Sequence, residues 1–212
     1  MIIDISRKLN TQTPTWPGDQ PFSYQLTWSK EETGSVNVGQ IASSCHTATH
    51  VDAPFHFNSH GTTIDQLPLE LFIGKAKVVD VSTKQIIKPS DLAFVDFTGI
   101  KRLLLKTNAW KDETSFPKEI PVLDSSLGAF LNARGVELIG VDLPSVDPID
   151  SKTLDTHHAF EENSIHILEG LNLTQVETGD YRLTALPLFI EGADGSPVRA
   201  ILETLDESDR RS

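Results

Sequence analysis

One eleven-residue segment constrains this chain more than any other. Residues 46–56 read HTATHVDAPFH and place three histidines and one aspartate at even-numbered positions, in a chain of 212 residues with seven histidines. Neutral imidazole and carboxylate are the natural ligands of a borderline ion such as zinc. The segment therefore predicts a metal site that takes part in chemistry.

The spacing within this segment limits its shape. His50 and Asp52 are two residues apart, so an extended backbone sends both side chains to the same face. His46 lies four residues before His50, and four extended residues span roughly 13 Å, too far for a shared metal shell. Pro54 disfavours a helix through the segment. We therefore expect the chain to turn near residues 47–49 and to form a bent loop around an ion.

A short loop rarely supplies a complete catalytic shell, so further ligands are expected elsewhere. His157 and His158 fall near the end of a predicted helix and are followed by the acidic residues Glu161, Glu162 and Glu169. Adjacent helical residues point about 100° apart, so only one of the two histidines should face a site. The residue pattern alone does not choose between them. His60 and His166 are expected at the surface. Cys45 is expected to be a small buried residue, with a thiolate metal ligand as the alternative.

Composition narrows the class of protein. A length of 212 residues suits one domain, and a formal net charge of -12 disfavours nucleic acid and anionic membranes as partners. The single cysteine allows no internal disulfide. The sequence shows neither a signal peptide nor an apolar run near the roughly 20 residues of a membrane span. The expected location is the cytoplasm.

Hydrophobic periodicity predicts many strands and few helices. A short apolar run at 101–107, a capped helix from 127 to about 135 and a strand at 136–142 resemble a β-α-β unit. The other predicted elements are strands at 2–9, 22–29, 36–44, 76–81 and 165–168, a helix from a cap at 150–151 to about 163, and strands at 181–188 and 198–204 joined by a Gly-Ala-Asp-Gly turn. We expect a single α/β domain over residues 1–212, with a mixed sheet and a few flanking helices.

The histidine segment resembles the His-x-Gly-Thr-His-x-Asp-x-Pro-x-His signature of the cyclase-like metal-dependent hydrolases. Within this family the chain is most similar to the bacterial kynurenine formamidases. The supporting segments are residues 16–19, 140–148, 151–158, 167–171 and 185–188, so the resemblance runs along essentially the whole chain. The resemblance implies a cyclase-like fold and a homodimer. The homodimer could not be predicted from the hydrophobic periodicity of the sequence.

The resemblance also implies a set of metal ligands. His46, His50 and Asp52 would hold a first ion, and Asp52 would bridge to a second. His157, selected over its neighbour, would help to hold the second ion, and Glu169 would contact both. Zinc is favoured by these ligand types, although manganese or cobalt could occupy the same set.

Three further positions follow from the resemblance. His56 corresponds to a histidine that transfers protons, and Trp16 corresponds to an aromatic residue lining the substrate pocket. Ala48 stands where the family often has glycine, so its methyl group demands an ordinary backbone conformation or mild strain.

The activity implied by the resemblance is hydrolysis of N-formyl-L-kynurenine, a small aromatic formamide of tryptophan degradation, to L-kynurenine and formate. One alternative is a related hydrolase acting on a cyclic amide such as isatin. Another is a metal-binding protein without catalysis. Structural zinc sites usually close all four positions with Cys and His, whereas this set is rich in carboxylates and leaves His56 over, which favours an open site.

Overall fold

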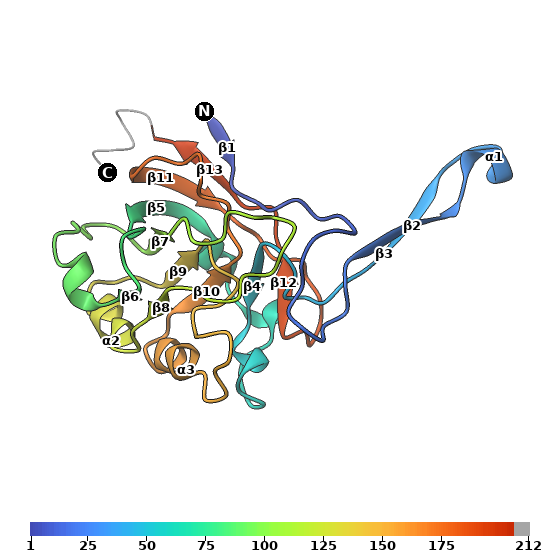
Figure 1. Cartoon of the computed structure of the whole chain (residues 1–212). Helices are drawn as coiled ribbons and strands as arrows, with labels where there is room; N and C mark the ends of the chain where they lie inside the picture. Colours follow the sequence, from blue (N-terminus) through green and yellow to red (C-terminus); the bar gives the residue numbers. More distant parts are fainter. Residues whose placement is uncertain (206–212) are drawn as a thin grey trace.

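A nine-stranded mixed sheet forms the centre of the molecule in the computed structural model, which describes residues 1–205 (Figure 1). Its four middle strands, β5, β7, β9 and β10, are parallel to one another, and the remaining neighbours are antiparallel. The predicted α/β class with a mixed sheet is confirmed. In spatial order the strands are β1 (Ile2–Asp4), β13 (Ile201–Thr204), β11 (Gly179–Thr184), β5 (Ile73–Asp80), β7 (Arg102–Lys106), β9 (Leu138–Val141), β10 (His166–Glu169), β4 (His50–Asp52) and β12 (Gly195–Pro197).

The central strands are apolar because both faces of the sheet are covered. Leu103 and Leu105 pack into one buried cluster with the helices α2 (Leu127–Asn132) and α3 (Asp155–Glu162), whereas Leu104 packs into a second cluster on the opposite face. Consecutive residues of a strand alternate between faces, so a continuous apolar run is what a strand between two cores requires. Four short 3-10 helices add to the loops: η1 (Pro54–His56), η2 (Ile64–Gln66), η3 (Leu69–Phe72) and η4 (Pro89–Leu92).

The predicted β-α-β unit is present, since β7 and β9 are parallel neighbours connected through α2. The predicted start of the next helix is wrong. Residues 148–151 form a turn in which the Ser151 amide donates to the Pro148 carbonyl, and α3 begins only at Asp155. Pro148 favours a turn at this point, so Asp150 and Ser151 belong to the turn and do not cap the helix.

The C-terminal hairpin was predicted only in part. The strands β11 and β13 pair as expected, but β11 ends at Thr184, well before Leu188. The segment between them is not a tight turn, because residues 195–197 cross back to pair with β4 as strand β12. Pro187 has no amide hydrogen, so a strand could not continue through it as a regular ladder.

A two-stranded arm projects from the body (Figure 1). It consists of β2 (Ser23–Trp28), the single-turn helix α1 (Lys30–Thr33) at its tip, and β3 (Val38–Ala42). All residues of both strands are exposed. A second small sheet pairs β6 (Ile86–Ile87) with β8 (Val122–Leu123). Across residues 1–205, the helices are all too short or too polar to cross a membrane.

Candidate metal centre

Strand pairing brings two distant parts of the chain together. β4 and β10 are antiparallel, and their register sets His50 directly opposite Glu169. Asp52, two residues beyond His50, points to the same face. All three side chains are buried, with exposures of 2%. The sheet thus fixes an imidazole and two carboxylates in one small space before any loop contributes.

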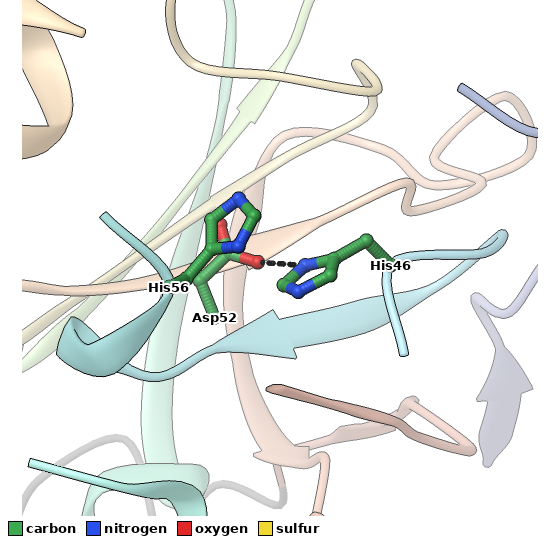
Figure 2. Close-up of side chains that lie close together, drawn as sticks. All are labelled: His46, Asp52 and His56. Atoms are coloured by element: carbon green, nitrogen blue, oxygen red, sulfur yellow. Dashed lines mark hydrogen bonds and ion pairs between the residues drawn. The ribbon is translucent and has the colours of Figure 1, made fainter. Parts of the chain in front are cut away.

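The bent loop before β4 supplies a second imidazole. Ala48 adopts a left-handed conformation with φ of 60°, and the chain turns there, so His46 folds back until its Nδ1 lies 2.8 Å from Oδ1 of Asp52 (Figure 2). A left-handed alanine is strained. The turn aims the Ala48 carbonyl at Nδ1 of His50, 3.0 Å away. Of the two alternatives stated for Ala48, an ordinary conformation or mild strain, the structure has the strained one, and it orients His50, a predicted ligand.

Gly170 holds the other side of this loop. It has φ of 65°, and a Cβ there would overlap the carbonyl oxygen of Ala48. We predict that Gly170→Ala destabilises the fold by at least about 3 kcal/mol in urea unfolding, from backbone strain plus overlap. Gly135→Ala is the matched control, because Gly135 has φ of 76° with open space around it and should cost only about 1 kcal/mol. Equal losses in the two variants would contradict the close approach.

The helix α3 supplies a third imidazole. Nε2 of His157 lies 3.6 Å from Oδ2 of Asp52 and 3.8 Å from Oε1 of Glu169. His157 is buried, whereas His158 is exposed and faces Glu161 at 4.0 Å. The choice of the first histidine over the second therefore agrees with the placement of the two rings, and its role as a ligand stays a prediction.

The two carboxylates present one oxygen to each side of the site. Oδ1 of Asp52 and Oε2 of Glu169 lie 3.3 and 3.5 Å from Nε2 of His50. Their other oxygens face His157. Oδ2 of Asp52 is buried without a hydrogen-bond partner among the described residues. Two imidazole–carboxylate sets sharing both carboxylates, with an unpartnered buried oxygen, fit a pair of divalent cations.

The electrostatics of the cluster point the same way. Burial opposes the charged form of His50 and of His157. Asp52 and Glu169 outweigh it for His50, and a hydrogen bond to Asp147 together with the nearby Asp52 does so for His157, so the pKa of each is raised to about 10. Burial also opposes ionisation of Asp52, yet hydrogen bonds from the histidines hold its pKa well below its usual value. Burial and then the charge of Asp52 raise the pKa of Glu169. Cations could replace the protons that otherwise balance these buried charges.

In each candidate ligand histidine, the ring nitrogen that faces away from the Asp52 and Glu169 carboxylates has a hydrogen-bond partner of its own. Nδ1 of His157 lies 2.6 Å from Oδ2 of Asp147, and Nε2 of His46 lies 2.9 Å from Oδ2 of Asp194. The Ala48 carbonyl plays this part for His50. Such outer partners fix the tautomer and ring orientation of metal-ligating histidines. The observed pattern is the one expected of imidazoles held ready for metal.

Sequence reasoning missed both aspartates. Asp147 lies within a segment that supported the family resemblance, 140–148, so a signal for it existed. The sequence carried no such signal for Asp194, because this residue lies in a Gly-Ala-Asp-Gly run that suggested only a turn between two strands. Its position beside His46 arises from the pairing of β12 with β4.

Asp147 offers a test of this outer support. Its carboxylate also accepts from the backbone amides of Thr156 and His157, so it fixes the start of α3 as well as the ring. We predict that Asp147→Asn lowers zinc affinity by about 10–100-fold in competition with a chelator. Asp155→Asn, in the same helical turn, is the control. An unchanged zinc affinity in Asp147→Asn would contradict the role of Asp147 in orienting His157.

A cavity of about 250 Å³ opens onto the cluster, and it is lined by the two remaining predicted site residues, His56 and Trp16. His56 stacks on His46 with ring centroids 3.8 Å apart, and its Nδ1 lies 3.7 Å from Asp194. Figure 2 shows both rings close to the Asp52 carboxylate, with His46 hydrogen-bonded to it. His56 is about one-third exposed, and burial lowers its pKa. Trp16 lines the same cavity and meets Phe116 edge-on at 5.3 Å.

The other groups considered from sequence lie outside the cluster. His60 is exposed, as expected. His166 is half-buried at the start of β10, so its expected surface position is only partly right. Cys45 is half-buried, and burial, followed by the charge of Asp194, raises the pKa of its thiol. A raised pKa disfavours a thiolate ligand at this position.

A mixed α/β sheet with a largely buried cluster of three imidazoles and two carboxylates at a cavity defines a candidate metal-dependent enzyme. The model of the putative cyclase family matches residues 3–148. Kynurenine formamidases of Geobacillus thermodenitrificans and Bacillus cereus are 52% and 48% identical, each alignment covering 96% of this chain and 97% of the relative. The chain therefore belongs to the cyclase family.

Solved structures agree on the fold. An isatin hydrolase A from Labrenzia aggregata superposes with a TM-score of 0.82 at 22% identity, over 97% of this chain and 94% of that one. A predicted metal-dependent hydrolase from Bacillus stearothermophilus gives a TM-score of 0.79 at 24% identity, over 95% and 97%.

Proposed function

We propose that this protein hydrolyses N-formyl-L-kynurenine to L-kynurenine and formate. The observation that carries the proposal is the paired-carboxylate cluster opening onto a 250 Å³ cavity with a further histidine, His56, at its wall. The high identity to kynurenine formamidases over nearly the whole chain supports the substrate.

The reaction needs three things from the site. The formyl carbonyl must be polarised, a water must become nucleophilic, and the departing aniline nitrogen must gain a proton. Divalent cations, held by His46, His50, Asp52, His157 and Glu169, would supply Lewis acidity and lower the pKa of water. The chain's own residues must then orient the substrate and move the proton.

We assign the transfer of that proton to His56. Its pKa is lowered by burial, so the ring is neutral at physiological pH and able to accept a proton from water. It can then deliver the same proton to the leaving nitrogen. Trp16, on the cavity wall, would stack against the aromatic ring of the substrate, adding about 0.5–1.5 kcal/mol beyond burial.

Several finer features belong to the same proposal. We propose zinc as the native metal and two ions per chain, on the strength of the ligand types and the shared carboxylates. A homodimer, a single domain over residues 1–212 and a cytoplasmic location complete it. Manganese and cobalt remain chemically suitable for the same ligands.

Isatin is the competing substrate, because isatin hydrolases share the fold. Their identity to this chain is only 22%, which supports the architecture rather than the substrate. We predict that the purified protein has a kcat/KM for N-formylkynurenine at least about 100-fold above that for isatin, a difference of roughly 2.7 kcal/mol in transition-state binding. The reverse order would replace the proposed substrate with the cyclic amide.

A further inference from the structure

The wall of the substrate cavity carries a carboxylate that the proposed reaction leaves unused. Asp19 lines the cavity but lies outside the cluster of imidazoles and carboxylates. One of its oxygens, Oδ2, accepts a hydrogen bond from the Ser44 hydroxyl at 2.9 Å. Within residues 1–205 the other oxygen, Oδ1, has no hydrogen-bond partner. A half-buried carboxylate with one oxygen to spare can bind a cationic group of a ligand.

A tight turn places this carboxylate beside the proposed aromatic platform. Residues 16–19 read WPGD, and the Asp19 amide donates to the Trp16 carbonyl at 3.0 Å. Proline at the second position and a glycine at the third with φ of 101° are what a type II turn requires. The two ends of such a turn lie within about 7 Å of each other. The turn therefore holds Trp16 and Asp19 side by side, and both line the cavity.

Ser44 fixes the position of this carboxylate relative to the candidate metal centre. Its hydroxyl, which donates to Asp19, also accepts from the backbone amide of His46 at 3.2 Å. The Ser44 amide donates in turn to the Gln20 carbonyl at 3.2 Å. Because His46 is a candidate ligand, Asp19 keeps a defined place relative to the atoms that would react. A group held in this way can select a substrate by what it carries beyond the reacting bond.

The charged residues of the cavity favour an ammonium group over a carboxylate. Of the residues in the range 1–205 that line the cavity, none is lysine or arginine. An ammonium group beside Trp16 can pair with Asp19, whereas a carboxylate there meets a like charge and no basic side chain. Like charges placed together reject a ligand, and opposite charges select it. The sign of the wall therefore indicates a substrate with an amine.

We propose that Asp19 binds the α-ammonium group of the substrate and makes the site selective for aryl formamides whose side chain carries an amine. The inference rests on the proposed hydrolysis of N-formyl-L-kynurenine and names the residue that recognises its amino-acid portion. In that substrate the formamide and the amino-acid chain are attached to adjacent carbons of one ring. With the ring on Trp16, the formamide faces the cluster and the ammonium group faces Asp19.

The test compares two substrates that differ only in the amine. They are N-formyl-L-kynurenine and its deaminated analogue, 4-(2-formamidophenyl)-4-oxobutanoate, with formate release measured in zinc-loaded protein. We expect Asp19→Asn to raise KM for N-formyl-L-kynurenine by at least about 10-fold, with kcat changed by less than about twofold, because a hydrogen bond to a charged group is lost from binding. KM for the analogue should stay within about twofold or fall, since a repulsion is removed. The amide oxygen of the variant can still accept from Ser44, so the wall keeps its shape.

Asp150→Asn is the matched control. Asp150 is exposed and precedes the cavity-lining Ser151, but it does not line the cavity itself, so this variant removes the same charge without the contact. It should leave KM for both substrates within about twofold of the wild-type values. Calorimetric titration with L-kynurenine measures binding without turnover. Its Kd should rise by at least about 10-fold in Asp19→Asn and stay unchanged in Asp150→Asn.

Two results would overturn the proposal. An equal rise in KM for both substrates would make Asp19 a structural residue of the cavity wall. An unchanged KM for N-formyl-L-kynurenine, with an unchanged Kd for L-kynurenine, would show that Asp19 does not recognise the amine. Failure of the wild-type protein to release formate from N-formyl-L-kynurenine would instead refute the proposed function, and the L-kynurenine titration would still report on Asp19.

Discussion

Replacement of Asp52 by Ala is expected to remove at least one metal ion per chain and to lower turnover by at least about 10³-fold. Asp52 is the residue through which the two halves of the cluster meet, with Oδ1 facing His46 and His50 and Oδ2 facing His157. Its loss deprives both candidate ion positions of a ligand at once. Lewis-acid stabilisation is worth several kcal/mol, and each 1.4 kcal/mol is about tenfold in rate.

Elemental analysis of the purified variant provides the measurement. Asp19→Asn is the control, because Asp19 lines the same cavity but its carboxylate accepts from Ser44 rather than facing the cluster. The control should retain the metal content of the wild-type protein. An Asp52→Ala protein with an unaltered ratio of metal to chain would contradict the bridging role.

Replacement of His56 by Ala is expected to separate metal binding from catalysis. The ring lies on the cavity wall against His46 and is more exposed than any candidate ligand histidine. We expect near-normal metal content with turnover reduced by about 10²–10⁴-fold, the usual contribution of a positioned acid–base group. The loss should fall on kcat, because proton transfer contributes to the transition state rather than to substrate binding.

His158→Ala is the matched control for this variant. His158 is an exposed histidine close to the cluster in sequence, and its removal should leave kcat near that of the wild-type protein. Full activity of His56→Ala would assign proton transfer to another group. A parallel fall in metal content would instead make His56 a ligand, since one candidate grouping of its atoms includes His46 and Asp52.

Local rules were sufficient to predict much of the fold and site. The short, continuous apolar run around Leu103–Leu105 identified a buried strand by its length, and the spacing of His50 and Asp52 placed two side chains on one face. An extended chain would hold His46 and His50 too far apart to share an ion, so a turn was expected between them, and the left-handed Ala48 provides it.

What could not be predicted depends on contacts between distant segments. Glu169 reaches His50 only through the β4–β10 register, and Asp194 reaches His46 only because β12 returns to the edge of β4. No local pattern encodes such pairings. The choice of His157 over His158 also needed the family resemblance, because helical geometry says only that the two rings diverge.

Zinc titration into chelator-treated protein, with formate release from N-formylkynurenine measured alongside bound zinc, tests the central claim most directly. We expect the stripped protein to release no formate and its activity to return as bound zinc rises to two ions per chain. Undiminished formate release from the stripped protein would contradict it.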